Sequence, residues 1–337
     1  MKNKRKIVLC GLIFGAAVQF VAAQDYKKLA QTGFQFLSVN SDGRASALAG
    51  AVTATEMGSA ALFFNPATMG GMTGLIDATA SINEFIADIR HNTFSLALSP
   101  LRGEYGVIGF SVQTVDYGEL QGTRVAANDK GFVDTEIMTP TALAIGVGYA
   151  KRLTDRFTVG GQIKYTHQNL HESFVVASRV TPDSLETGTV ENELSPLAYD
   201  FGTLFKTGFK SLAFGMSVRN FSREIKYAEE GFQLPLVFQL GIAMDLFDLW
   251  KPGVIDHSLV MSVDATHYRS HPEQILVGLD YRVMDFLSFR GGYVSNNDED
   301  GLTFGFGVCY MGLSLDYAYT PFGVFDRVQR MTARFSM

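Results

Sequence analysis

Residues 302–310, LTFGFGVCY, alternate strictly between large apolar side chains and small or polar ones. Successive side chains of a β-strand point to opposite faces, so this period of two predicts a strand with one continuous apolar face. The same period recurs in residues 212–219 (LAFGMSVR) and 236–246 (LVFQLGIAMDL). The pattern predicts an all-β protein.

Extending the same period along the chain predicts fourteen strands, which is an even number. The predicted strands are residues 75–83, 91–99, 105–116, 139–151, 157–167, 196–206, 211–220, 235–246, 257–268, 273–282, 286–295, 301–310, 312–320 and 327–336. A soluble β-sandwich also shows alternation, so the strands alone do not decide where the apolar face points.

The lengths of the connections favour a membrane barrel. Short turns follow the second, fourth, sixth, tenth and twelfth strands, whereas long polar loops at 117–138, 168–195 and 221–234 follow the third, fifth and seventh. Short periplasmic turns opposite long external loops are typical of outer-membrane barrels, and closure leaves no unpaired edge in the membrane. We therefore predict a 14-stranded antiparallel transmembrane β-barrel formed by residues 75–337.

Residues 1–23 have the features of a cleavable signal peptide. Four basic residues among the first six precede an apolar run at 7–21, and Val21-Ala22-Ala23 offers small residues for cleavage before Gln24. The alternative, an uncleaved membrane anchor, is disfavoured because the run is shorter than the ~20 residues that span a bilayer. Together with the barrel, this leader predicts a protein exported to the cell outer membrane.

The charge balance and the cysteines exclude other classes. Removal of a leader with four basic and no acidic residues changes the formal net charge from −6 to −10, which argues against nucleic acid as a partner. Cys309 alone remains after cleavage, so no intrachain disulfide is expected. No linker of Pro, Gly or Ser divides the chain, and no Ser/His/Asp or Cys/His spacing predicts an enzyme.

Residues 40–71, NSDGRASALAGAVTATEMGSAALFFNPATMGG, differ from everything after them. They are crowded with Ala and Gly, carry the single cation Arg44 and end near Asn65-Pro66-Ala67. A compact segment of small residues before so many strands is expected to be enclosed by them. We call residues 24–74 the hatch segment and predict that it lies in the lumen of the barrel.

Three N-terminal motifs carry a family resemblance. Phe34-x-Phe36-Leu37, Gly43-Arg44-Ala45-Ser46-Ala47-Leu48-Ala49-Gly50-Ala51 and Ala61-Leu62-Phe63-Phe64-Asn65-Pro66-Ala67 resemble the N-terminal signature of the PorV/PorQ family of outer-membrane proteins, relatives of the FadL long-chain fatty-acid transporter. Later segments, among them 149–157 and 315–323, follow the family pattern in order and spacing. The resemblance covers nearly the whole chain after the leader.

The resemblance implies a FadL-like barrel with a hatch in its lumen, and a hatch motif of Gly43, Arg44, Gly50, Asn65, Pro66 and Ala67. It also implies a function, that of an accessory component of the type IX secretion system that binds or anchors exported proteins at the cell surface. Its expected partners are outer-membrane lipid and secretion-system proteins or secreted cargo. The alternative is a FadL-like channel for hydrophobic small molecules, with a hydrophobic ligand in the lumen.

If the apolar faces contact lipid, the alternate residues line the lumen. The candidate lumen-facing charges are Lys164, Lys206, Arg219, Asp245, Asp264, Asp280, Arg282, Arg290 and Asp316. They form either a mutually paired lining, since charges inside a barrel are tolerated when paired, or a binding path and anchors for the hatch segment. Arg44 is a candidate partner for one of the carboxylates.

Metal and cofactor sites are not predicted. The pairs His167/His171 and His267/His271 have a helical spacing, but each lies where a strand enters a loop, so the two rings would not converge. Asn296-x-Asp298-x-Asp300-Gly301 matches the first half of a calcium loop, but Gly307 stands where the loop needs a bidentate Glu. A hairpin of turn-forming residues accounts for it better.

Overall fold

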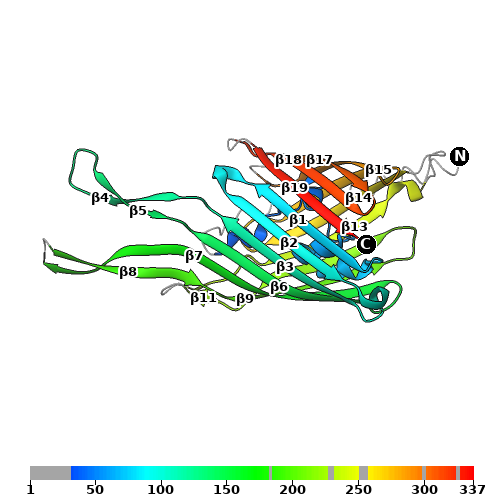
Figure 1. The fold of residues 1–337 in the computed structure, drawn as a ribbon, viewed down its shortest axis with the longest axis horizontal. Coiled ribbons are helices and arrows are strands. Elements are labelled where there is room, and N and C mark those ends of the chain that lie inside the picture. Colours follow the sequence, from blue (N-terminus) through cyan, green and yellow to red (C-terminus); the bar gives the residue numbers. More distant parts are fainter. Residues whose placement is uncertain (1–31, 182–183, 227–230, 250–256, 298–300, 324–326) are drawn as a thin grey trace.

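Fourteen strands close into one antiparallel barrel in the computed structural model (Figure 1). The structure describes residues 32–181, 184–226, 231–249, 257–297, 301–323 and 327–337, so the predicted leader, residues 1–23, lies outside the described residues. The circle closes because the first barrel strand, β1, pairs with the last, β19, and β6 pairs with β7.

The barrel strands are β1 (Ile76–Glu84), β2 (Arg90–Leu98), β3 (Val107–Asp116), β6 (Thr141–Arg152), β7 (Phe157–Thr181), β9 (Leu197–Lys206), β10 (Ala213–Phe221), β13 (Val237–Asp245), β14 (His257–Tyr268), β15 (Gln274–Val283), β16 (Leu287–Val294), β17 (Leu302–Tyr310), β18 (Leu313–Pro321) and β19 (Arg327–Ser336). Outside the barrel wall the strands of the described residues are β4 (Leu120–Val125), β5 (Phe132–Met138), β8 (Ser184–Leu194), β11 (Ile225–Lys226) and β12 (Gly231–Phe232). The predicted number of barrel strands, fourteen, is confirmed.

The long connections differ from the predicted loops. β7 continues to Thr181, well past the predicted end at 167, and pairs with β8, while β4 pairs with β5 inside the predicted loop 117–138. A hairpin satisfies the backbone hydrogen bonds of its own two strands, so these segments stay extended beyond the barrel wall. Figure 1 shows both hairpins projecting from the same end of the barrel.

The two faces of the wall differ as the period of two requires. On β15, Ile275 and Leu279 are exposed on the outside, whereas Leu276 and Asp280 are buried on the inside. Tyr268, at the end of β14, lies on the same inward face as buried Thr266 and lines a lumenal cavity. No helix within the described residues is long and apolar enough to span a bilayer.

The described part of the hatch segment, residues 32–74, runs through the lumen from one end to the other. Thr32 forms a bridge with Gln233 at the end that carries the hairpins, the long-loop end. Ile76, just after the segment, pairs with Met337 at the opposite end, the short-turn end. Between them lie η2 (Gln35–Ser38), α2 (Gly43–Ala47), η3 (Gly58–Phe63) and η4 (Pro66–Gly71), drawn in blue among the strands of Figure 1.

Candidate functional site

Asn65 fastens the hatch segment to the barrel wall. Its side chain is fully buried; the amide donates to the carbonyls of Thr53 (2.7 Å) and Thr203 on β9 (3.0 Å), and its Oδ1 accepts the Ala67 N–H (3.1 Å). The last contact caps η4, where Pro66 occupies the first turn and supplies a preset backbone angle. One side chain therefore joins two parts of the hatch segment and one wall strand.

The five-residue helix α2 is held at both its cap and its first residue. Asp42 caps it by accepting the Ala45 N–H (2.7 Å), and the Gly43 N–H donates to Thr332 Oγ1 on β19 (2.7 Å). Burial raises the pKa of the Asp42 carboxyl above its ordinary value, while the Ala45 N–H acts in the opposite direction. Gly50 follows the helix with φ +80°, a conformation that favours glycine.

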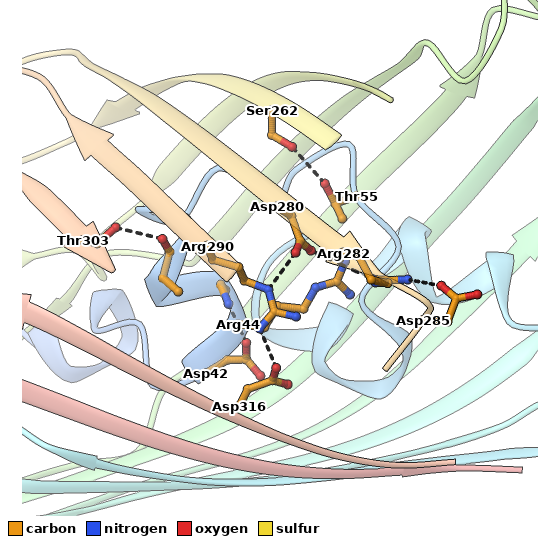
Figure 2. Close-up of polar contacts among 12 residues, drawn as sticks. Asp42, Arg44, Thr55, Ser262, Asp280, Arg282, Asp285, Arg290, Thr303 and Asp316 are labelled. Atoms are coloured by element: carbon orange, nitrogen blue, oxygen red, sulfur yellow. Dashed lines mark hydrogen bonds and ion pairs between the residues drawn. The ribbon is translucent and has the colours of Figure 1, made fainter. Parts of the chain in front are cut away.

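Arg44, the cation of the hatch motif, reaches a charged network on the wall (Figure 2). Its guanidinium donates to the Glu56 carbonyl (3.2 Å) and lies 3.5 Å from Asp280 Oδ2. Arg290 links the network, since its Nε lies 3.1 Å from Asp280 Oδ1 and its Nη1 2.5 Å from Asp316 Oδ1. Burial lowers the pKa of the Arg44 guanidinium, and the Asp280 carboxylate opposes that shift.

The structure brings five of the sequence-predicted residues together in this network: Arg44, Asp280, Arg282, Arg290 and Asp316. The others lie elsewhere in the lumen: Lys164 pairs with Asp200 (2.8 Å), Lys206 pairs with Glu56 (2.7 Å), Arg219 donates to the Phe63 carbonyl and to Gln239, Asp264 accepts the Thr53 N–H (2.9 Å), and Asp245 accepts the Phe247 N–H (2.9 Å). Lys206, Arg219 and Asp264 on the wall each contact the hatch segment, and Arg44 of the hatch segment contacts Asp280, so these charges join the segment to the wall.

Two cavities lie on either side of α2. The first, about 630 Å³, reaches the short turns at Lys210 and Asp285 and is lined by Arg44 and Arg282; we call it the short-turn cavity. The second, about 550 Å³, lies toward the long-loop end and is lined by aromatic side chains that include Phe85 and Phe322, by amides and by Arg219 and Arg330. Residues of the hatch segment line both cavities.

Several functional charges were missed from the sequence. Arg334 pairs with Asp77 across β19 and β1 (2.7 Å), and Asp200 neutralises Lys164. The period of two was sufficient to assign them to the inward face. Asp77 lies two residues from buried Thr79 on β1, and Arg334 lies two residues from buried Thr332 on β19. Glu56 belongs to the irregular hatch segment, so no period pointed to it.

One histidine of each pair contacts another polar side chain. His167 Nδ1 lies 3.0 Å from Ser195 Oγ, and His267 lies 3.1 Å from Glu273. Among the described residues, no three His, Cys, Asp or Glu side chains are grouped so that they could hold a metal ion. Asp298 and Asp300 of the calcium-like motif lie outside the described residues.

We expect Asn65→Ala to loosen the hatch segment by about 1–3 kcal/mol, because it leaves buried carbonyls of Thr53 and Thr203 without their donor. Limited proteolysis of the purified barrel, read as the rate of cleavage within residues 40–72, measures the change. Thr73→Ala, at an exposed residue of the same segment, is the control. Equal cleavage rates in the two variants would contradict the anchoring role of Asn65.

Comparisons with known proteins agree with this geometry. Solved structures with the same fold include the toluene transporter TbuX of Ralstonia pickettii (14% identity, 88% of this chain and 98% of that chain, TM-score 0.59), the CymD monoaromatic hydrocarbon channel (12%, 89% and 98%, 0.57) and a FadL homologue of Pseudomonas aeruginosa (14%, 88% and 99%, 0.56). At these identities the likeness shows the fold alone. Comparison with curated proteins gives no match.

The family model described as type IX secretion system protein PorV matches residues 22–251, more than half of the chain. That match includes the hatch motif, the two projecting hairpins and the first eight barrel strands. It agrees with the 14-stranded FadL-like barrel and with location in the outer membrane. This chain therefore belongs to the PorV family of type IX secretion system outer-membrane proteins.

Proposed function

We propose that this protein binds or anchors exported proteins at the cell surface, as a non-enzymatic component of the type IX secretion system. The family match supports the secretion role. The proposal includes a division into a cleaved leader (1–23), a hatch segment (24–74) that closes the lumen, and a barrel (75–337).

The observation that carries the proposal is the apolar surface of the β4–β5 hairpin. Val125 is 89% exposed, and Leu120, Phe132, Val133 and Ile137 are exposed as well. This hairpin projects beyond the barrel wall (Figure 1), so contact with the lipid does not account for these side chains. Contiguous exposed apolar groups away from lipid mark surfaces that bind another protein, and Val125 and Phe132 are direct cross-strand partners. In outer-membrane barrels the long loops lie outside the cell, so the proposal assigns this surface to the external side.

Replacing residues 119–138 with a short turn tests the proposal without opening the wall, because β3 and β6 pair directly up to Asp116 and Thr141. We expect recovery of secreted cargo with the affinity-purified barrel to fall by about tenfold or more, as when the main apolar anchors of an interface are lost. Heat-dependent mobility on a gel, which distinguishes folded from unfolded barrels, verifies assembly of the variant.

Two substitution variants sharpen this experiment. Val125→Asn with Phe132→Asn removes apolar surface and should lower cargo recovery by about tenfold or more, since the two anchors contribute about 1–2 kcal/mol each. Asp129→Ser with Lys130→Ser alters the tip of the same hairpin without removing apolar surface and should leave recovery unchanged. Full recovery of cargo and normal processing of secreted proteins with the shortened hairpin would contradict the proposal.

Uptake of hydrophobic small molecules is the second candidate function. The 550 Å³ cavity at the long-loop end favours it, since Phe85, Phe322 and Leu276 give that cavity apolar walls. Normal cargo recovery from the shortened hairpin, together with a lipid or detergent molecule retained in the lumen of the purified protein, would favour uptake over cargo binding.

A further inference from the structure

We propose that Arg44 and Arg282 form a subsite for an oxyanion, a carboxylate, sulfate or phosphate group, at the back of the short-turn cavity. That cavity faces the periplasm in barrels of this class. The inference concerns the end of the molecule opposite to the hairpins and does not rest on the proposed binding of cargo.

Both guanidinium groups have N–H donors that lack a well-placed acceptor. Arg44 Nε is buried and makes no hydrogen bond, and Arg44 Nη2 lies 3.5 Å from Asp280. Arg282 makes only two ion pairs, at 3.9 Å to Asp280 and 3.7 Å to Asp285, within the described part of the chain. Charge-assisted N–H···O bonds are normally about 2.7–2.9 Å long, so neither arginine has a well-placed carboxylate.

The nearby carboxylates are already engaged. Arg290 pairs with Asp280 Oδ1 at 3.1 Å and with Asp316 Oδ1 at 2.5 Å. Arg44 and Arg282 therefore share the other oxygen of Asp280, Oδ2. Three further acidic groups of the short-turn cavity accept hydrogen bonds from other donors: Glu56 from Lys206, Asp42 from the Ala45 N–H and Asp245 from the Phe247 N–H. An added oxyanion would therefore supply acceptors that the protein does not.

The distances suit a bridging anion. Nη2 of Arg44 and Nη2 of Arg282 lie 3.5 and 3.9 Å from the same oxygen, so they are at most 7.4 Å apart, the sum of the two. Two oxygens of one oxyanion, about 2.5 Å apart and each accepting a bond of about 2.8 Å, span roughly 8 Å. Figure 2 shows the two guanidinium groups beside Asp280.

The cavity leaves room for the anion and a path to it. Its volume is about 630 Å³, and several of its wall residues are small, among them Ala213, Ala243, Ser288 and Ser314. This space is larger than a bare oxyanion, so the group is either a free hydrated ion or the end of a larger periplasmic molecule. Both sources present the same chemistry to the two arginines.

Cys309 provides a probe inside the same cavity. Its thiol is exposed, it lines the cavity, and it lies two residues along β17 from Gly307, which borders Asp316 and Arg290. With Cys10 changed to serine, Cys309 is the single thiol of the whole chain. The experiment compares its rates of modification by an anionic (sulfonate) and a cationic (trimethylammonium) methanethiosulfonate reagent in the purified barrel.

We expect the ratio of the anionic to the cationic modification rate to be higher for Cys309 than for a free thiol in solution. Arg282→Gln should lower the anionic-to-cationic ratio by about tenfold, because one unit charge in the same cavity changes each rate by about threefold, in opposite directions for the two reagents. Arg156→Gln is the matched control: it removes a cation at the same end of the barrel, in the turn before β7, and outside the cavity lining. The control should change the ratio by less than about twofold, since that charge is screened by solvent.

Competition then identifies the ligand and its source. Sulfate exchanged for chloride at constant ionic strength should slow modification at least about threefold, and Arg282→Gln should abolish this protection. A hexapeptide with a free C-terminal carboxylate that protects at lower concentration than sulfate, where its amidated form does not, would show that the oxyanion belongs to a larger molecule. An unaltered rate with both sulfate and the acidic peptide, or an unaltered charge ratio in Arg282→Gln, would overturn the proposal.

Discussion

Arg290→Ala is expected to destabilise the folded barrel by about 3–5 kcal/mol, because it leaves two buried carboxylates without their common cation. Arg290 joins Asp280 on β15 to Asp316 on β18, and all three side chains are buried. Removing one member of such a network costs more than the pair contributes, since the remaining charges cannot recover their hydration. Urea titration of the purified barrel in detergent, followed by tryptophan fluorescence, measures the loss.

Arg282→Ala is the matched control for this prediction. Arg282 contacts the same carboxylate of Asp280, but at 3.9 Å and with 36% of its side chain exposed, so its removal should cost less than about 1 kcal/mol. Combining Arg290→Ala with Asp316→Asn should restore part of the stability, because Asp316 is then neutral while Asp280 keeps Arg44 and Arg282 as neighbours. Equal losses for the two arginines, with no recovery in the double variant, would contradict the network.

Gly160→Val is expected to displace the hatch segment while the barrel stays closed. A Cβ added at Gly160 would lie 2.6 Å from the Pro66 carbonyl carbon and 2.6 Å from the Ala67 nitrogen, so a side chain there collides with backbone at the start of η4. Overpacking against atoms that cannot rotate away costs about 3 kcal/mol. We expect faster proteolysis of the hatch segment and higher single-channel conductance across a planar bilayer.

Gly161→Val separates this collision from a general effect on β7. Gly161 is the next residue of the same strand and points to the opposite face, where an added Cβ meets Asp200 O at 3.3 Å and the Phe201 ring at 3.6 Å. Its neighbours can adjust, and a β-branched residue suits a strand facing lipid. The prediction is wrong if Gly160→Val leaves conductance at the level of Gly161→Val.

The strands were predictable from the sequence because successive side chains of a strand alternate between two faces. With lipid outside and a polar lumen inside, the period of two is enforced along β14, β17 and β19, whose predicted bounds match the structure to within one residue. The prediction failed where this constraint ends. Beyond the wall, β7 has no lipid on one side and no lumen on the other, so its extension to Thr181 left no such signal.

The partners of the charges were not predictable in the same way. Alternation indicates that Asp280 and Arg290 point inward, but not that Arg44, 236 residues before Asp280, lies against the same carboxylate. That contact depends on the path of the hatch segment through the lumen, and an irregular segment has no period from which its path can be inferred. The close approach of Gly160 to η4, which leaves no room for a side chain, also depends on the path of the hatch segment.

By itself, the sequence determined the fold class, the number of strands, the inward and outward faces and the family, because these follow from local alternation, connection lengths and short motifs. The tertiary structure alone decided which charges meet, which residues line the two cavities on either side of α2, and that Arg44 and Arg282 share one oxygen of Asp280. The physical reason is that closing the barrel joins β1 to β19 and surrounds the hatch segment with strands distant in sequence. Contacts across the lumen are therefore properties of the closed barrel and leave no pattern in any single stretch of the chain.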